Sequence, residues 1–228
     1  MTCSKSSPSK KTPRRPKRNR ILRVALTGGI ACGKSVVARL LAAKGCIVYS
    51  ADETAHALMR PGRPAYRKIV ARFGRSILRP DRTIDRRSLG ARVFTDPKAR
   101  RFIDRTVHPL VLADQEKAVR RLEREGRAWI FVVEAALTVE AGYAGLFDRV
   151  VVVHCRKADQ VLRLRRRDGI TRTAALRKIG AQMPVREKLG HADYAVDASG
   201  TLASTVEQTE RLYAQLVRDA ELKRLGRV

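Results

Sequence analysis

The chain has few cysteines, and it lacks any long apolar run. Its four cysteines, Cys3, Cys32, Cys46 and Cys155, are scattered, without the paired CxxC spacing of a zinc site or the density of a disulfide-stapled secreted domain. No run approaches the roughly 18 uninterrupted apolar residues that a membrane-spanning helix needs. We therefore expect a globular protein outside the membrane, in a reducing, cytoplasmic compartment.

Acidic residues are also scarce, because 22 Asp and Glu face 49 Lys and Arg and leave a formal net charge of +27. Such a surplus favours anionic partners and excludes the class of acidic, solvating proteins. Eight of the positive charges lie in residues 1–20, which contain no acid, so the other 208 residues still carry +19. By composition, residues 1–20 are a disordered basic tail, which improves solubility or contacts nucleic acid transiently through phosphates.

What the chain does have is an alternation of short apolar runs and helical patterns. A hydrophobic content of 44% suffices for a core. The alternation predicts an α/β fold, a doubly wound parallel sheet with helices between the strands. We expect buried strands near residues 24–28, 47–49, 129–133, 150–153 and 194–196, and a long amphipathic helix over 202–222.

The pattern also suggests a division of the folded part, 21–228, into three regions. Residues 53–127 are helical in pattern, with breaks at Gly and Pro residues that include Pro109. We expect a nucleotide core at about 21–60 and 128–222, an inserted helical acceptor subdomain at about 61–127 and a helical lid at about 160–185.

The strongest motif is G-x-x-x-x-G-K-[ST], which spans Gly28 to Ser35 between a predicted strand and a predicted helix. Gly28, Gly29 and Gly33 let backbone amides point inward around phosphate oxygens, beside the positive end of the helix dipole. Lys34 can reach the β and γ phosphates, and the Ser35 hydroxyl can coordinate Mg²⁺. The motif predicts a nucleotide-binding P-loop.

Acids follow two of the predicted strands. Asp52 stands at the carboxyl end of the strand over 47–49, where ligands bind in doubly wound sheets, and it could orient and deprotonate an acceptor hydroxyl. Alternatively, Ser50 and Glu53 form a capping box that merely begins a helix. Glu134 ends the strand over 129–133, as expected of a metal-binding Walker-B position. Glu140 follows after a short turn, where it caps the turn or binds ligand.

Basic residues in two later segments are weaker candidates. Arg163 and Arg167 share one helix face with Gln160, either as part of a flap that closes over nucleotide or as a solvated basic face. His108 precedes Pro109, so it is either a ligand-binding residue or the boundary of a helix that starts at the proline.

These motifs, in this order over about residues 23–215, resemble the dephospho-coenzyme A kinase family of P-loop kinases. The similar positions are Leu26 to Ile30, Gly33 to Ser35, Ala51, Asp52, Ala55, Pro61, Gly62, Phe73, Gly74, Ile84 to Arg86, Leu89, Phe94, His108, Pro109, Gln160, Arg163, Leu164, Arg167, Gln182, Ala192 to Tyr194 and Gly200. The resemblance implies phosphorylation of the ribose 3′-hydroxyl of dephospho-coenzyme A by MgATP, the last step of coenzyme A synthesis.

The resemblance also implies roles for individual residues. Residues 31–36 would bind ATP through Ala31, Cys32, Gly33, Lys34, Ser35 and Val36. The predicted catalytic residues are Lys34, Asp52, Arg163 and Arg167, the metal-binding residues are Ser35 and Glu134, and the acceptor-binding residues are Asp52, Arg86, His108 and Glu140.

The sequence departs from the family pattern at several of these positions. Ala31 and Cys32 stand where the family commonly has Gly and Ser, and Val36 replaces a Thr. Ser50 replaces the first Asp of an Asp-Ala-Asp motif, and Ala198 occupies a usual Asn position. Weaker nucleotide affinity is therefore expected.

We expect a monomeric kinase whose substrates are ATP and dephospho-coenzyme A. Because both substrates are polyanions, a basic cleft suits them. Two alternatives remain at this level, a kinase for another nucleoside or nucleotide, and a basic nucleic-acid-binding protein with a secondary P-loop.

Overall fold

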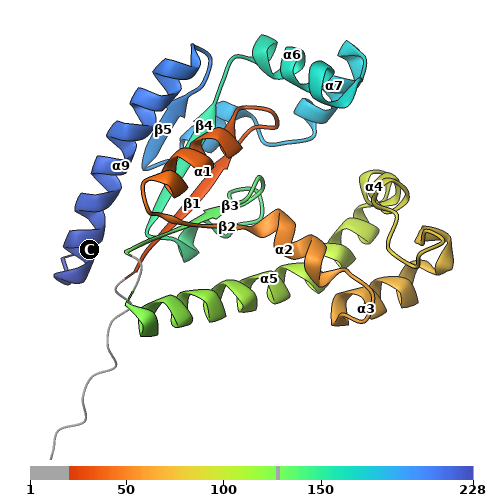
Figure 1. Ribbon diagram of the computed structural model, residues 1–228. Helices are drawn as coiled ribbons and strands as arrows, with labels where there is room; N and C mark the ends of the chain where they lie inside the picture. The colour runs from red at the N-terminus through yellow and green to blue at the C-terminus, as the bar shows by residue number, and fades with distance from the viewer. Residues whose placement is uncertain (1–20, 127–128, 228) are drawn as a thin grey trace, which may run out of the picture.

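The structure is a computed structural model that describes residues 21–126 and 129–227, so the predicted disordered tail lies outside the described residues. Its centre is a five-stranded sheet in which every strand pairing is parallel (Figure 1). In sheet order the strands are β2 (Ile47–Ser50), β3 (Ile130–Glu134), β1 (Leu22–Gly28), β4 (Arg149–His154) and β5 (Tyr194–Asp197). The predicted α/β fold with a parallel sheet is confirmed.

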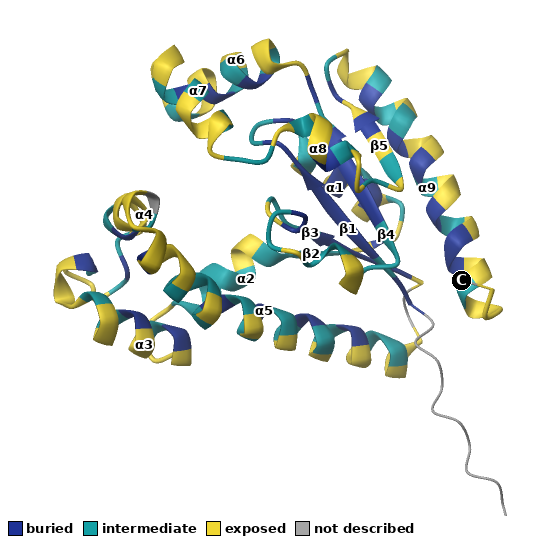
Figure 2. Cartoon of the chain, turned by 180° about the vertical axis from the view of Figure 1, so that it is seen from behind, coloured by how far each residue is buried: buried dark blue, intermediate teal, exposed yellow. Residues whose placement is uncertain are grey.

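Helices cover both faces of this sheet. On one face lie α1 (Lys34–Ala43) and α9 (Leu202–Arg224), and on the other lie α5 (Pro97–Glu125) and the short α8 (Val185–Leu189). Figure 2 shows the buried residues of α9 on the side of the helix that faces the strands. Because successive strand residues point to opposite faces, β3 and β4 need apolar side chains at nearly every position. Burial on both faces therefore explains the continuous apolar runs of β3 and β4.

Two expectations about buried strand residues were wrong. β2 is an edge strand, and its Ile47 is 37% exposed, because only β3 pairs with it. Trp129 precedes β3 and is 47% exposed, and its ring stacks on the guanidinium of Arg224 at 4.2 Å. The guanidinium stabilises this partly exposed aromatic ring through a cation–π contact.

A separate hydrophobic cluster holds the helices that follow β2. These are α2 (Ala51–Leu58), α3 (Pro64–Phe73), the 3₁₀ turn η1 (Arg75–Ile77) and α4 (Arg86–Thr95). In Figure 1 they lie around the right-hand end of α5, whereas α9 lies at the opposite, left-hand side of the molecule. Their buried residues pack against the first half of α5.

The expected break at Pro109 was wrong, since Pro109 lies inside the 29-residue helix α5. That helix begins at Pro97 and is capped by Asp96, whose carboxylate accepts a hydrogen bond from the Lys98 amide at 2.7 Å. His108 is therefore a mid-helix residue and not a helix boundary. Proline removes one helical donor, but the buried stripe of Val107, Val111, Gln115 and Val119 continues past it and outweighs that loss.

After β4 the chain forms two packed helices, α6 (Lys157–Asp168) and α7 (Arg172–Gly180). They lie at the top of Figure 1, whereas α3 and α4 lie to the right. A short 3₁₀ turn, η2 (Ala144–Leu146), precedes β4. Within the described ranges, no helix combines the length and apolar character needed to cross a membrane.

A partly buried ion pair ties the far edge of the sheet to α9. The Arg149 guanidinium donates two hydrogen bonds to the Asp219 carboxylate, at 2.8 and 2.9 Å, and the Tyr194 hydroxyl donates a third at 2.7 Å. The hydrogen bonding of Arg149 to Asp219 is the main reason that the pKa of Arg149 lies above its ordinary value. One carboxylate therefore joins β4, β5 and the closing helix.

Replacing this carboxylate should destabilise the fold strongly. We expect Asp219→Ala to lower the free energy of unfolding by about 3 kcal/mol, because Arg149 would remain in a largely closed site without its partner. Urea denaturation followed by circular dichroism measures the loss. Glu207→Ala, which removes an exposed pair with Arg211 on the same helix, should cost about 0.5 kcal/mol or less. Equal losses in the two variants would contradict the importance of the Asp219 network.

Candidate active site

The predicted P-loop connects β1 to α1, and two of its glycines are required by the backbone. A Cβ on Gly28 would lie 2.2 Å from the carbonyl oxygen of Val153 on the neighbouring strand, so no other residue fits there. Gly33 has φ +91° and precedes the first turn of α1. Only glycine adopts such an angle without strain. The loop can therefore fold back tightly over the start of α1, whose free amides and dipole favour an anion.

Two glutamines hold the middle of the loop. The Gln160 side-chain amide donates to the Ile30 carbonyl at 2.9 Å, and the Ile30 amide donates to the Gln182 side-chain oxygen at 2.7 Å. Gln160 is on α6 and Gln182 follows α7, so both helices are coupled to the loop. Both glutamines match the family pattern in the sequence, but no contact with the P-loop was predicted for them. A glutamine amide far along the chain carries no spacing signal that would have indicated this contact.

A cavity of about 660 Å³ opens in front of the P-loop. Of the predicted ATP-binding residues, Gly29, Ala31, Cys32, Gly33, Lys34, Ser35 and Val36 line it, whereas Gly28 is not among its lining residues. The predicted catalytic residues Lys34, Asp52, Arg163 and Arg167 line it as well. The structure thus gathers these predicted residues, from three separate parts of the chain, around one cavity.

Glu134 lies against the last two residues of the motif. Its carboxylate accepts a hydrogen bond from the Ser35 hydroxyl at 2.9 Å, and the Lys34 ammonium lies 3.4 Å from the same oxygen. This places the acid that ends β3 beside the hydroxyl predicted to bind metal. The arrangement sets the Ser35 hydroxyl, which lines the cavity, beside the carboxylate of Glu134, which is not among the lining residues.

The structure confirms the helix cap at Ser50 and places Asp52 beside the P-loop cavity, while the action of Asp52 as a base stays a prediction. Ser50 caps α2, since its hydroxyl accepts a hydrogen bond from the Glu53 amide at 3.2 Å. Asp52 occupies the first turn of that helix and lines the cavity of the P-loop. The cap fixes the direction in which α2 begins, and with it the position of the carboxylate.

A second cavity, about 130 Å³ in volume, adjoins α2 and α5. Apolar side chains form most of its wall, and the polar groups include Asp52, His108, Gln115 and Tyr143. The His108 ring packs edge-to-face on the Tyr143 ring, with Nδ1 3.3 Å from the Tyr143 hydroxyl. Among the residues that line these two cavities, Asp52 is the one they share.

Two predicted acceptor residues lie outside both cavities. Arg86 opens α4 and lines another hollow, of about 560 Å³, with His56. Burial of the ring, and then the charge of Arg86, hold the pKa of His56 below its ordinary value. Glu140 forms an ion pair at 2.7 Å with Lys188, whose side chain is fully buried. The contact of Glu140 with ligand stays a prediction, because its described partner is this lysine.

Lys188 itself was missed by the sequence analysis. From α8 its ammonium reaches the carbonyl oxygens of Ala136 at 3.1 Å and Gly28 at 3.4 Å. Its charge is neutralised by Glu140, as a buried ammonium requires. The lysine thus contacts the P-loop at Gly28, the first residue of the motif. Its position in a run of ordinary charged residues gave no signal in the sequence.

The two arginines that were predicted to belong to a lid each have a hydrogen-bond partner. Arg163 donates to the carbonyl oxygen of Ala198 at 2.7 Å, and Arg167 donates to the Asp168 carboxylate at 2.7 Å. Both belong to α6, and they line the cavity from the same side. Arg165 and Arg166 of the same helix are exposed, and so is Arg167.

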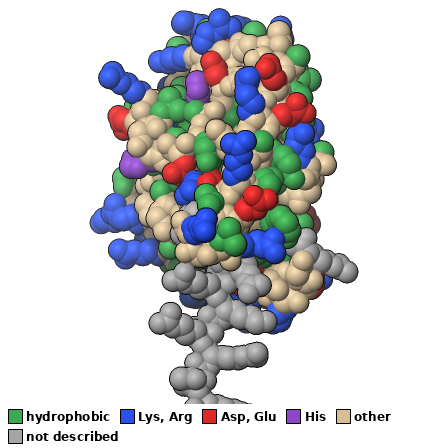
Figure 3. Space-filling model, turned by 90° about the vertical axis from the view of Figure 1, so that its left-hand side faces the viewer, with side chains coloured by type: hydrophobic (Ala, Val, Ile, Leu, Met, Phe, Trp, Pro, Cys, Tyr) green, Lys and Arg blue, Asp and Glu red, His purple; other side chains and the backbone are tan. Residues whose placement is uncertain are grey.

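The remaining positive charge is widely distributed. Figure 3 shows one face of the molecule, on which Lys and Arg side chains are spread over the surface with Asp and Glu between some of them. The charge on this face is therefore not gathered into one patch.

Comparison with known proteins places this site among kinases. A family model described as dephospho-CoA kinase matches residues 22–204. A dephospho-CoA kinase of Anaeromyxobacter dehalogenans is 42% identical over 193 residues, which are 85% of this chain and 91% of that protein. Among solved structures, TT1252 from Thermus thermophilus is similar with a TM-score of 0.75 and 27% identity, over 86% of this chain and 97% of that one. The dephospho-CoA kinase from Campylobacter jejuni has a TM-score of 0.63 and 26% identity, over 86% and 98%.

One departure from the family pattern has a measurable cost. Ala31 has φ +58°, in the left-handed region where a side chain is strained by about 1 kcal/mol. We expect Ala31→Gly to raise the free energy of unfolding, by up to about 1 kcal/mol, in a urea titration.

The matched control is Ala214→Gly, at an exposed position inside α9, which should lower the same free energy by about 1 kcal/mol. Opposite signs for the two alanine-to-glycine changes are expected. A loss at both positions would contradict strain at Ala31.

Proposed function

The chain belongs to the dephospho-CoA kinase family, and from this premise we propose how its residues transfer the γ-phosphoryl group of ATP to the ribose 3′-hydroxyl of dephospho-coenzyme A. The protein is an ATP-dependent kinase of the last step of coenzyme A synthesis. The observation that carries the residue assignments is that Asp52 borders both the P-loop cavity and the cavity beside α5.

The P-loop holds the triphosphate of ATP. Amides of residues 31–36 and the N-terminus of α1 surround the cavity, and they donate to phosphate oxygens without protons having to move. Lys34 adds a charge that reaches the β and γ phosphates. The Gln160 and Gln182 contacts keep these donors in place, so little has to rearrange when the nucleotide binds.

Ser35 and Glu134 fit a magnesium ion. A hydroxyl oxygen and a carboxylate lie within a hydrogen bond of each other, and oxygen donors are those that Mg²⁺ prefers. When bound, the ion neutralises charge on the β and γ phosphate oxygens. Glu134 would hold it directly or through water, and Lys34 would release its present contact with Glu134 to the phosphates.

Asp52 accepts the proton of the 3′-hydroxyl and aims its oxygen at the γ phosphorus. The acceptor approaches from the cavity beside α5 and the phosphate from the P-loop side, so a carboxylate shared by the two cavities touches the reacting hydroxyl. Phosphoryl transfer depends mainly on alignment and charge, so aiming the hydroxyl matters as much as the proton transfer.

Arg163 and Arg167 stabilise the charge on the transferred group. Both line the cavity from α6, the helix that also contacts the P-loop through Gln160. Closure of α6 and α7 over the nucleotide would bring the guanidinium groups onto the phosphoryl oxygens and exclude water. The lid boundaries at about 160–185 remain a proposal, as does the acceptor subdomain at about 61–127.

The acceptor lies against the apolar cavity with His108 at its rim. Apolar walls suit the non-ionic parts of dephospho-coenzyme A, and His108 and Tyr143 supply polar contacts. Arg86 and Glu140 would act farther out, on the pyrophosphate side and through Lys188, respectively. The monomeric state, the cytoplasmic location and nucleic-acid contacts of the tail stay predictions.

The role of Asp52 is tested by Asp52→Asn in a coupled assay for ADP, with ATP and dephospho-coenzyme A as substrates. We expect kcat to fall by about 10²- to 10⁴-fold, because the amide cannot accept the hydroxyl proton, while the KM for ATP changes little. Glu53→Gln, at the next position of the same helix, should keep full turnover. Full turnover by Asp52→Asn would refute the assignment of Asp52 as the base. If the wild-type enzyme phosphorylated other nucleosides at the same rate, the assignment of dephospho-coenzyme A as the acceptor would be refuted.

His108→Ala tests the acceptor site separately. We expect the KM for dephospho-coenzyme A to rise by about tenfold while the KM for ATP stays the same, because only the cavity beside α5 loses a polar contact. His191→Ala, at an exposed position outside the lining of both cavities, is the control. Equal rises of both KM values would show that the variant disturbs the fold and not the acceptor alone.

A further inference from the structure

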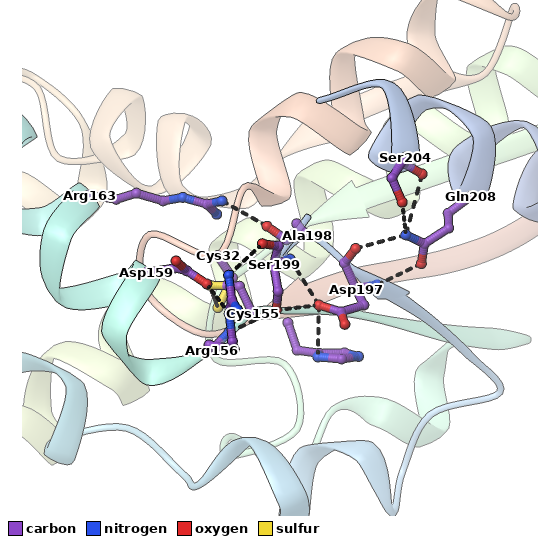
Figure 4. Close-up of polar contacts among 11 residues, drawn as sticks. Cys32, Cys155, Arg156, Asp159, Arg163, Asp197, Ala198, Ser199, Ser204 and Gln208 are labelled. Carbon is purple, nitrogen blue, oxygen red and sulfur yellow. Dashed lines mark hydrogen bonds and ion pairs between the residues drawn. The ribbon is translucent and has the colours of Figure 1, made fainter. Parts of the chain in front are cut away.

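Two buried thiols meet beneath the P-loop. The Sγ atoms of Cys32 and Cys155 are 3.6 Å apart, and the Cys155 thiol donates to the Cys32 sulfur. Figure 4 shows the two sulfur atoms side by side, with Arg163 reaching toward Ala198 nearby. Cys32 belongs to the loop itself, whereas Cys155 directly follows β4, so the pair joins segments that are 123 residues apart.

The surroundings of the two sulfurs differ in a way that assigns them different reactivity. The hydrogen bond from Cys155 is the main cause that lowers the pKa of the Cys32 thiol, and the charge of Arg163 acts in the same direction. The same bond, with burial, raises the pKa of Cys155. Cys46 is also buried, and burial raises its pKa to about 11. Cys32 therefore has the most thiolate character of these three.

We propose that Cys32 and Cys155 are a peroxide-sensitive dithiol, which closes to a disulfide across the base of the P-loop and thereby weakens nucleotide binding. The effect on nucleotide binding rests on the proposed function, whereas the disulfide itself can form whatever the loop binds. The oxidant is hydrogen peroxide, a molecule small enough for thiols that are 1% and 6% exposed.

The reaction is a two-step, two-electron oxidation. The Cys32 thiolate attacks one oxygen of hydrogen peroxide, the O–O bond breaks, and Cys32 becomes a sulfenic acid while the other oxygen leaves as water after taking up a proton. Cys155 then attacks the Cys32 sulfur, the S–O bond breaks, and the hydroxide leaves as a second water with the Cys155 proton. Overall, two thiols and one peroxide give one disulfide and two waters.

Closure must move the loop, because Cys155 is the better anchored partner. Its neighbours are fixed on both sides, since the Ala198 amide donates to the His154 carbonyl at 2.8 Å and the Arg156 amide donates to the Ser199 hydroxyl at 3.0 Å. A disulfide needs about 2.05 Å between sulfurs, well below the present 3.6 Å. The difference would therefore be taken up at Cys32.

The Cys32 backbone is part of the phosphate-binding turn. Its amide donates to the Gly29 carbonyl at 3.2 Å, and it directly precedes Gly33 and Lys34. A shift of about 1 Å in such donors can cost about 10²-fold in function. A disulfide at this position should therefore lower the affinity for ATP. Conversely, bound ATP fills the cavity that Cys32 lines, and so it should slow the oxidation.

The disulfide is tested on the full chain by mass spectrometry. The protein is treated with hydrogen peroxide, remaining thiols are blocked, and unreduced tryptic peptides are analysed. We expect one cross-linked species that joins the peptides of Cys32 and Cys155, that disappears with dithiothreitol and that forms more slowly at saturating ATP. Oxidation without this cross-link, or cross-linking mainly through Cys46 or Cys3, would overturn the proposal.

The effect on ATP is measured by calorimetry, with each protein compared with its own reduced form. Oxidised wild-type protein should bind ATP at least about tenfold more weakly, and dithiothreitol should restore the affinity. After the same treatment, Cys155→Ala should keep its affinity within about twofold, and Cys46→Ala should behave like the wild type. A reversible loss of the same size in Cys155→Ala would overturn the disulfide as the cause.

The failure of this proposal can be distinguished from failure of the proposed function. If reduced wild-type protein binds no ATP, the nucleotide site is wrong, whatever the cross-link shows. If the reduced protein binds ATP and the cross-linked protein binds it equally well, only the control of binding by the disulfide is refuted.

Discussion

The close approach of Gly28 to the backbone of β4 determines where the P-loop leaves the sheet. The register pairs Gly28 with Val153, and the space between them excludes even one Cβ atom. From this point the loop rises over α1, and Gln160, Gln182 and Lys188 hold it from outside its own sequence. Phosphate-binding amides are useful only when they are fixed before the ligand arrives, and these contacts fix them.

The structural position of Asp52 in a helix start does not exclude the chemical role that we propose for it. The Ser50 cap begins α2 directly at the end of β2, and this leaves the carboxylate in the first turn at the boundary of two cavities. A negative side chain is also favourable in the first turn of a helix. The residues that begin α2 therefore also determine where the carboxylate of the proposed base lies.

Much of the fold followed from the sequence, because strands that are buried on both faces need apolar residues at nearly every position. β3 and β4 were predictable for this reason, and the long helix α9 was predictable from its amphipathic pattern. β2 also begins with apolar residues, Ile47 and Val48, and nothing in its sequence shows that the strand lies at an edge. Pro109 was misread because a buried stripe on both sides of a proline can continue a helix, and only the packing reveals it.

The same limit applies to the site. The P-loop, Asp52 and Glu134 could be singled out as candidates because glycine spacing and acids at strand ends are local signals, whereas the Gln160, Gln182 and Lys188 contacts come from distant segments. Pro109 has a mechanical consequence as well. The first half of α5 packs in the helical cluster and the second half on the sheet, and the missing donor falls within the first of these stretches, between Val107 and Val111. The packing of Val107 and Val111 therefore keeps α5 continuous across a backbone hydrogen bond that the proline cannot make, and a loss of that packing would let the helix bend at Pro109.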